Sequence, residues 1–126
     1  MVERSIVKPR TKSAMVVGGW RLFDPLLCDL LRRAGHQRVI VSRSGGRATL
    51  ERVRPDVVVV MASAGADRPL DAIRRVRLAA PDSRIVVLAT EEDVLWFALA
   101  RAMGADDTIG SGAAGEELLA AFSLAA

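Results

Sequence analysis

Residues 55–63 read Pro-Asp-Val-Val-Val-Val-Met-Ala-Ser, and this stretch decides the fold. Its four consecutive valines, Val57 to Val60, are β-branched and apolar at every position, so a strand made from them must be buried on both faces. Strands of this kind are typical of the centre of parallel sheets that helices cover on both sides. Ligands of such sheets bind beyond the carboxyl ends of the strands, where Met61, Ala62 and Ser63 are expected.

Strand and helix signals alternate along the rest of the chain. Strand-like apolar stretches occur at residues 14–17, 38–41, 55–63, 85–88 and 108–109. A helix start follows each of them, at residues 24, 47, 67, 91 and 116. This alternation of strands and helices predicts an α/β fold. The helices then act as right-handed crossovers between parallel strands, which limits the possible strand orders. The expected architecture is a doubly wound five-stranded parallel sheet of strand order 2-1-3-4-5, with helices on both faces.

Periodicity also gives expectations for single residues. In the helix that begins at residue 67, the expected core stripe is Leu70, Ile73, Val76 and Leu78, and the arginines expected to face solvent are Arg74, Arg75 and Arg77. His36 follows the glycine that ends the first helix, and it is expected to be exposed. Cys28 adjoins the leucine stripe of that helix and is expected to be an inert thiol.

Charge and composition bound the class of protein. Of the 126 residues, 51% are hydrophobic and 26% are charged, which is typical of one globular domain. Residues 1–12 carry a net charge of +3, while the remainder holds 14 basic and 14 acidic side chains. We therefore expect a flexible basic leader, residues 1–13, followed by a single domain, residues 14–126.

Targeting signals are missing from the sequence. No stretch approaches the ~20 consecutive apolar residues that a membrane-spanning helix needs, and no apolar segment follows the charged N-terminus as it would in a secretory signal. Cys28 is the single cysteine, which excludes an internal disulfide and fits a reducing compartment. The expected location is the cytoplasm, without membrane contact.

Five stretches carry a more specific signal: LLCDLLRRAG (26–35), RPDVVVVMA (54–62), AIRRVRLAAPDSRIVVLAT (72–90), RAMGADDTIG (101–110) and AAGEELLAAF (113–122). In composition and spacing, the chain from Ala14 to Phe122 resembles the receiver domain of response regulators, the phospho-aspartate switch of two-component signalling. The resemblance implies the doubly wound fold and a regulatory role in a bacterial-type phosphorelay or in transcription control.

The working residues of the receiver family have all been replaced here. By the resemblance, the acidic pair that holds Mg²⁺ corresponds to Gly18 and Gly19, and the phosphorylated aspartate corresponds to Met61. The hydroxyl switch of the fourth strand corresponds to Ala89. The remaining two positions, the aromatic switch and the lysine of the fifth strand, correspond to Thr108 and Ser111.

These replacements remove the chemistry of the family. Mg²⁺ prefers hard oxygen ligands, and a thioether with two glycines supplies none from side chains. Acyl-phosphate formation needs a carboxylate nucleophile, which methionine lacks. We therefore expect no phosphoacceptor, no metal, no cofactor and no catalytic residue. The sequence predicts a non-enzymatic, phosphorylation-independent pseudo-receiver.

Two hypotheses concern the vacated pocket, which consists of Gly18, Gly19, Trp20, Met61, Ala89 and Ser111. In one, Trp20 fills the space that the charged residues leave, or simply covers the core as a loop residue. In the other, a small molecule binds in this pocket and the protein is a ligand sensor. The sequence leaves both open.

Residues 94–103 are apolar except for Arg101, more than one buried helix face requires. The excess indicates a protein contact, either with another protein or with a second copy of the chain, on a face formed by Trp96, Leu99, Met103 and Thr108. A deeply packed alanine-rich helix is the alternative. The arginines are dispersed over three helices and nothing resembles a helix-turn-helix, so we expect no direct nucleic-acid binding by this domain.

Overall fold

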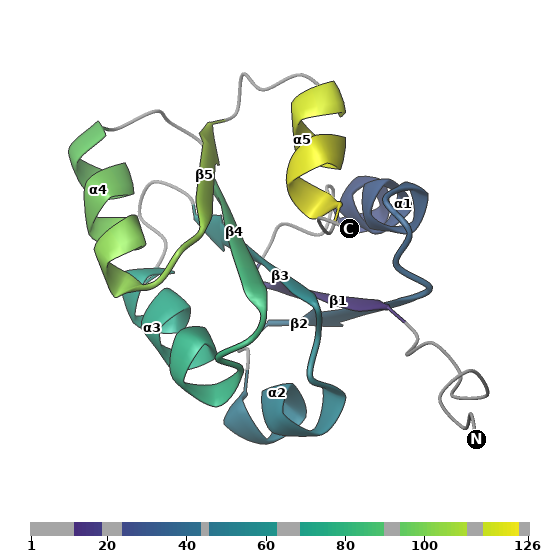
Figure 1. Cartoon of the computed structure of the whole chain (residues 1–126), viewed down its shortest axis with the longest axis horizontal. Helices are drawn as coiled ribbons and strands as arrows, with labels where there is room; N and C mark the ends of the chain where they lie inside the picture. Colours follow the sequence, from purple (N-terminus) through teal and green to yellow (C-terminus); the bar gives the residue numbers. More distant parts are fainter. Residues whose placement is uncertain are drawn as a thin grey trace, which may run out of the picture.

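The computed structural model describes residues 12–18, 24–43, 46–62, 69–89, 94–110 and 115–123. Within these ranges the strands are β1 (Ser13–Val17), β2 (Arg38–Ser42), β3 (Val57–Ala62), β4 (Arg84–Ala89) and β5 (Asp107–Gly110). The helices are α1 (Asp24–Arg33), α2 (Arg47–Val53), α3 (Pro69–Ala79), α4 (Val94–Met103) and α5 (Gly115–Phe122). All strand pairs are parallel and the order is β2-β1-β3-β4-β5 (Figure 1), so the predicted sheet is confirmed.

β3 lies at the centre of the sheet because its side chains are apolar on both faces. It pairs with β1 on one side and with β4 on the other. Val58 and Val60 enter a core cluster shared with α2, α3 and α4, whereas Val57 and Val59 enter a second cluster shared with α1 and α5. Each face of the sheet therefore has its own core, and the helices divide three to two between the faces (Figure 1).

The described part of the leader is short. Lys12 precedes the sheet and Ser13 already begins β1, one residue earlier than expected, while the rest of the predicted leader lies outside the described residues. No helix within the described ranges has the length and apolar character needed to cross a membrane.

The prediction that His36 is exposed is wrong, since only 1% of its surface is accessible. Gly35 has a φ of +107° and ends α1, with its N–H bonded to the carbonyl of Arg32, and the N–H of His36 bonds to the carbonyl of Leu31. In this type of helix ending, the residue after the glycine packs back against the helix. The ring of His36 is thereby buried, and its Nε2 lies 2.8 Å from the carbonyl oxygen of Phe122, at the end of α5.

α3 corrects a second expectation. Ile73 and Val76 are fully buried, as predicted, but Leu78 is 73% exposed. Successive residues of an α-helix are separated by 100° around its axis, so Leu78 lies about 200° beyond Val76 and faces solvent. The prediction that Arg77 faces solvent is also wrong. Arg77 lies beside the buried stripe, and its guanidinium donates a hydrogen bond to the carbonyl of Gly104, in the turn after α4.

Candidate functional site

Gly18, Met61 and Ala89 lie together at the carboxyl edge, where the parallel strands end. Val17 pairs with Val60, so Gly18 is level with Met61 on the neighbouring strand. A β-carbon placed on Gly18 would lie 3.5 Å from the carbonyl oxygen of Met61 and 3.9 Å from its Cβ. Ala89 closes β4 at the residue paired with the last residue of β3. The fold thus brings three of the six predicted pocket residues to one edge.

The backbone at Gly18 is suited to glycine. Its φ is +79°, and its N–H donates a hydrogen bond to the carbonyl of Ser42 at 3.1 Å. Residues with a side chain adopt this left-handed region at a cost of order 1 kcal/mol or more. Gly18 therefore has a backbone conformation that glycine adopts more readily than any residue with a side chain.

Met61 is part of the hydrophobic core. Its half-buried side chain packs against the cluster on the α1 and α5 face, as do Leu88 and Ile109. Neither Gly18, Met61 nor Ala89 has an oxygen-bearing side chain. In the part of the chain that the structure describes, no group of three or more histidine, cysteine, aspartate or glutamate residues could hold a metal ion.

The other predicted pocket residues, Gly19, Trp20 and Ser111, lie outside the described residues. The same is true of the segments that follow β1, β3, β4 and β5, residues 19–23, 63–68, 90–93 and 111–114. The two hypotheses for the pocket, a tryptophan plug and a bound small molecule, therefore stay predictions.

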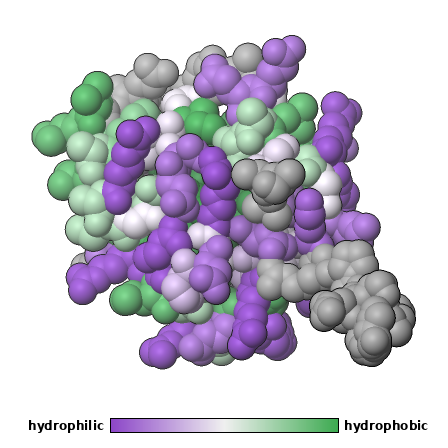
Figure 2. All heavy atoms as spheres, in the orientation of Figure 1, coloured by the Kyte–Doolittle hydropathy of each residue, from purple (hydrophilic) through white to green (hydrophobic). Residues whose placement is uncertain are grey.

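The outward side of α4 is an apolar surface. Val94 is 86% exposed, Leu95 72%, Leu99 43% and Met103 36%. Ala98 and Ala102 are exposed as well, and Arg101 is the single charged residue on the helix. We call these six apolar residues the α4 face. Hydrophobic residues gather in the upper left of Figure 2, in the place that α4 occupies in Figure 1.

The predicted interaction face is divided by the structure. Leu99 and Met103 belong to the α4 face, but Trp96 and Thr108 are half-buried. Trp96 packs with Phe97 against the core, with ring centroids 6.2 Å apart in an edge-to-face arrangement. Fully buried Ala100 sets the rotation of the helix, which points Val94 and Leu95 outward. The alternative of a deeply packed alanine-rich helix does not hold, since Ala100 alone of its alanines is buried.

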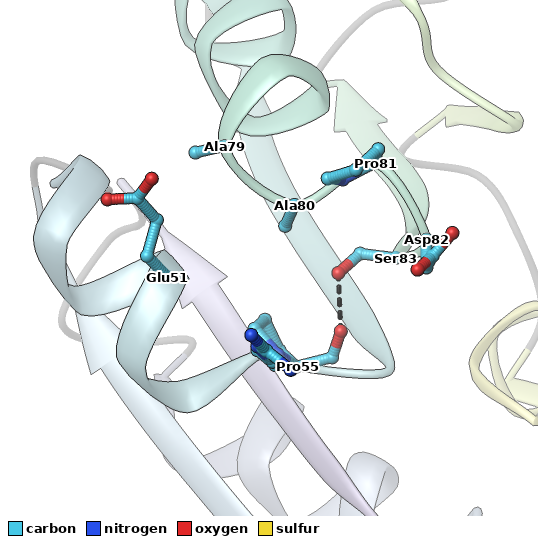
Figure 3. Close-up of a pocket in the computed structure, with 8 residues that line it drawn as sticks. Glu51, Pro55, Ala79, Ala80, Pro81, Asp82 and Ser83 are labelled. Atoms are coloured by element: carbon cyan, nitrogen blue, oxygen red, sulfur yellow. Dashed lines mark hydrogen bonds between the residues drawn. The ribbon is translucent and has the colours of Figure 1, made fainter.

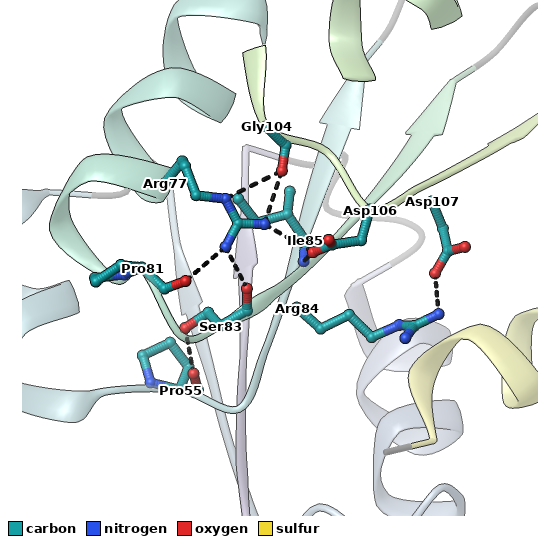
Figure 4. A network of polar contacts seen from close by, with 9 residues as sticks. All are labelled: Pro55, Arg77, Pro81, Ser83, Arg84, Ile85, Gly104, Asp106 and Asp107. Atoms are coloured by element: carbon teal, nitrogen blue, oxygen red, sulfur yellow. Dashed lines mark hydrogen bonds and ion pairs between the residues drawn. The ribbon is translucent and has the colours of Figure 1, made fainter. Parts of the chain in front are cut away.

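Arg77 fixes the end of α4 (Figure 4). Its guanidinium donates to the carbonyl of Gly104 from both Nε (3.1 Å) and Nη2 (2.7 Å), and Nη2 forms an ion pair with Asp106 at 2.7 Å. Its Nη1 donates to the carbonyls of Pro81 at 2.8 Å and Ser83 at 2.9 Å. One side chain of α3 thus holds the turn before β4 and the turn between α4 and β5.

Two grooves lie outside the carboxyl edge. One, of about 420 Å³, opens between the ends of α2 and α3, where the hydroxyl of Ser83 donates to the carbonyl of Pro55 (Figure 3). The other, of about 330 Å³, lies beside β5 and α5, and its charged lining residues are Arg84, Arg101, Asp107 and Glu117. Arg84 and Asp107 are paired with each other in this second groove, which adjoins Arg101 of α4.

No protein-family model matches the chain, and no curated protein matches its sequence. Solved structures match its fold. A response regulator from Thermotoga maritima is 25% identical, with a TM-score of 0.69, over 88% of this chain and 93% of that one. The chemotaxis protein CheY4 of Vibrio cholerae is 19% identical, with a TM-score of 0.75, over 88% of this chain and 95% of that one.

A third structure offers a contrast in chemistry. A response regulator from Burkholderia pseudomallei, solved with a phosphorylated aspartic acid and a calcium ion, is 24% identical, with a TM-score of 0.69. The match covers 89% of this chain and 66% of that protein. The side chains described at the carboxyl edge here, those of Met61 and Ala89, carry no carboxylate.

Proposed function

This chain has the fold of a response-regulator receiver domain, and we propose that it works in signal transduction or transcription control without aspartyl phosphorylation, by associating with protein. The receiver fold supports a role in signal transduction, since the structures that share it include response regulators. The proposed module is regulatory and not an enzyme, binds no metal or cofactor, and acts in the cytoplasm.

The observation that carries this proposal is Met61 at the end of the central strand. A thioether cannot attack a phosphoryl donor as a carboxylate does, and it is a poor ligand for Mg²⁺. The side chain is half-buried and packs against the core cluster on the α1 and α5 face. Gly18, next to it, has no side chain and so supplies no carboxylate for a metal ion.

We expect no response to phosphoryl donors. Addition of Mg²⁺ with acetyl phosphate should give no covalent phosphate by intact mass spectrometry. Mg²⁺ with beryllofluoride, which mimics the phosphorylated state, should leave the amide NMR spectrum unchanged, because no carboxylate is present at position 61 to bind it. A receiver domain with an intact aspartate serves as the positive control. Labelling of this chain, or Mg²⁺-dependent shifts confined to residues around β3, would refute phosphorylation independence.

The α4 face supports the second part of the proposal, association with protein. A ten-residue surface helix ordinarily has a polar outer side, whereas here the outer side is aliphatic apart from Arg101. Contiguous exposed apolar surface of this kind marks interaction sites, and interfaces combine an apolar centre with a polar rim. The charged groove beside β5 adjoins Arg101 and would provide part of that rim. The partner that we propose for the α4 face is a second copy of this chain.

The α4 face predicts self-association that one substitution should weaken. In sedimentation velocity we expect a concentration-dependent dimer. Leu95→Asp should raise its Kd about 30-fold, or about 2 kcal/mol, because it buries a carboxylate at the centre of the contact. The matched control is Leu78→Asp on α3, since Leu78 is 73% exposed and Leu95 is 72% exposed. Equal weakening by both variants, or a wild-type chain that stays monomeric, would exclude the α4 face as a dimer interface.

A further inference from the structure

Basic and acidic residues are unevenly distributed along residues 13–126, although their net charge is zero. Residues 30–54 contain seven arginines and one acidic residue, Glu51, which is seven minus one, or +6. Residues 55–126 contain six arginines and 11 acidic residues, which is six minus 11, or −5. The expectation of no nucleic-acid contact rested on the dispersal of the arginines over three helices and on the lack of any resemblance to a helix-turn-helix. Whether the arginines gather on one side depends on the fold.

The structure divides the seven arginines around β2 and α2: Arg32, Arg33 and Arg38 lie at the amino end of β2, and Arg43 and Arg47 lie at its carboxyl end. Arg52 and Arg54 lie at the end of α2, where Arg54 lines the groove between α2 and α3. The seven belong to the end of α1, to β2 and the residue after it, and to α2 with its final turn, and every one is exposed. β2 is an edge strand of the sheet. Hydrophilic residues are prominent along the right and lower parts of Figure 2, where α1 and α2 lie in Figure 1. We call this surface the β2 side.

The β2 side has few counter-charges of its own. Arg33 pairs with Asp29 at 3.0 Å and Arg47 with Glu51 at 3.4 Å, both across one turn of an exposed helix, where such pairs are worth a few tenths of a kcal/mol. Among the described residues, no ion pair involves Arg32, Arg38 or Arg52. A solvated face usually mixes both signs of charge, so this excess of one sign calls for an anionic partner.

We propose that the β2 side binds the phosphodiester backbone of nucleic acid without sequence specificity. Apart from Lys12, the described basic residues of this surface are arginines, whose planar guanidinium donates paired hydrogen bonds to phosphate oxygens. Arg38 and Arg43 lie at the start and just past the end of β2, roughly 16 Å apart on an extended strand, and the alternation of side chains places them on opposite faces of the sheet at its β2 edge. Lys12, just before β1, lies beside the start of β2, where its carbonyl accepts hydrogen bonds from the N–H groups of Gln37 and Arg38.

A membrane surface fits the β2 side less well. Binding to lipid head groups is strengthened when apolar side chains insert beside the basic ones. The large hydrophobic residue exposed on β2 is Val41, at 39%, and the extensive apolar surface of the described residues lies on α4, next to the opposite edge of the sheet. An acidic protein could also satisfy the arginines, and the experiment therefore includes probes for both alternatives.

Fluorescence anisotropy of the full chain with a labelled 20-base-pair DNA of random sequence tests the proposal. At low salt we expect binding in the range usual for non-specific contacts, roughly 1–100 µM, and an affinity that falls steeply as salt rises. Arg38→Gln combined with Arg52→Gln should weaken binding and reduce the slope of log K against log salt by about 2. Arg74→Gln combined with Arg75→Gln removes the same charge from exposed residues of α3 and should leave both quantities unchanged.

Four outcomes would overturn the proposal. They are no anisotropy change at low salt, equal weakening by the two double variants, equally tight binding to polyglutamate, and binding to anionic phosphatidylserine vesicles in preference to DNA. Polyglutamate binding would assign the β2 side to an acidic protein, and vesicle binding would assign it to a membrane. The phosphorylation and dimer experiments do not involve the arginines of the β2 side. Their results therefore neither support nor contradict the proposal that this surface binds nucleic acid.

Discussion

Arg77→Ala is expected to lower the free energy of unfolding by about 3 kcal/mol, because it leaves three carbonyl groups and one carboxylate without their shared donor. Those acceptors are the carbonyls of Pro81, Ser83 and Gly104 and the side chain of Asp106. They come from two turns that lie far apart in the sequence, so the loss should loosen the packing of α3 against α4. Urea unfolding followed by circular dichroism measures the change.

Arg74→Ala is the matched control for this substitution. Arg74 lies on the same helix, is exposed, and should change stability by no more than about 0.5 kcal/mol. Arg77→Lys separates charge from geometry: lysine keeps the positive charge but cannot donate to two turns at once, so we expect it to recover less than half of the loss. If Arg77→Ala proves as mild as Arg74→Ala, the network does not hold the two turns together.

Gly104→Ala is expected to destabilise the domain by a similar amount, about 3 kcal/mol, for two physical reasons. The φ of Gly104 is +125°, a conformation that residues with a side chain rarely adopt. A methyl group there would also lie 2.9 Å from Cγ and 3.0 Å from Cβ of Arg77, which forces that side chain away from its acceptors. Gly104 ends α4 with its N–H bonded to the carbonyl of Arg101, so the helix ending would be disturbed as well.

The two substitutions should not be additive. In the Arg77→Ala background the contacts with Cγ and Nε are gone and no guanidinium hydrogen bonds remain to be broken, so Gly104→Ala should cost less, about 1–2 kcal/mol from backbone strain and the remaining 3.0 Å contact with Cβ. A double-mutant cycle by urea unfolding measures this coupling. Gly35→Ala is an informative comparison, because Gly35 also has a positive φ, +107°, but no atom lies within 4 Å of its missing β-carbon. If the losses in unfolding free energy from the two substitutions add fully, the contact between a β-carbon at residue 104 and the side chain of Arg77 does not contribute to the cost.

Local patterns predicted the framework of this fold well. The valine run of β3 required burial on both faces, and the alternation of strands and helices then left one simple sheet order, which the structure has. The exposed side of α4 was predicted only in part: an excess of apolar residues was visible, but its rotation was set by Ala100, whose burial depends on α3 and the sheet. The sequence therefore placed Trp96 on the exposed side of the helix, where it does not lie, and did not identify Val94 and Leu95 as part of that side.

Sequence pattern failed where a residue's environment comes from distant parts of the chain. His36 appeared to be a loop residue, yet the helix ending at Gly35 turns it inward and Phe122, 86 residues away, provides its hydrogen-bond partner. Arg77 belonged by its charge to a solvated face, yet Gly104, 27 residues on, accepts its hydrogen bonds. In hindsight the glycine before His36 was a usable signal, because the residue after such a glycine commonly packs against its helix.

The sequence by itself determined the parallel sheet, the order of its strands and the apolar side chain of Met61 in the central strand. These follow from periodicity and residue type, which each element carries along its own axis. Only the tertiary structure decided which sides of the molecule are apolar and which are basic. Those surfaces form when elements distant in the sequence pack together, so the α4 face and the β2 side depend on neighbours that no local pattern specifies.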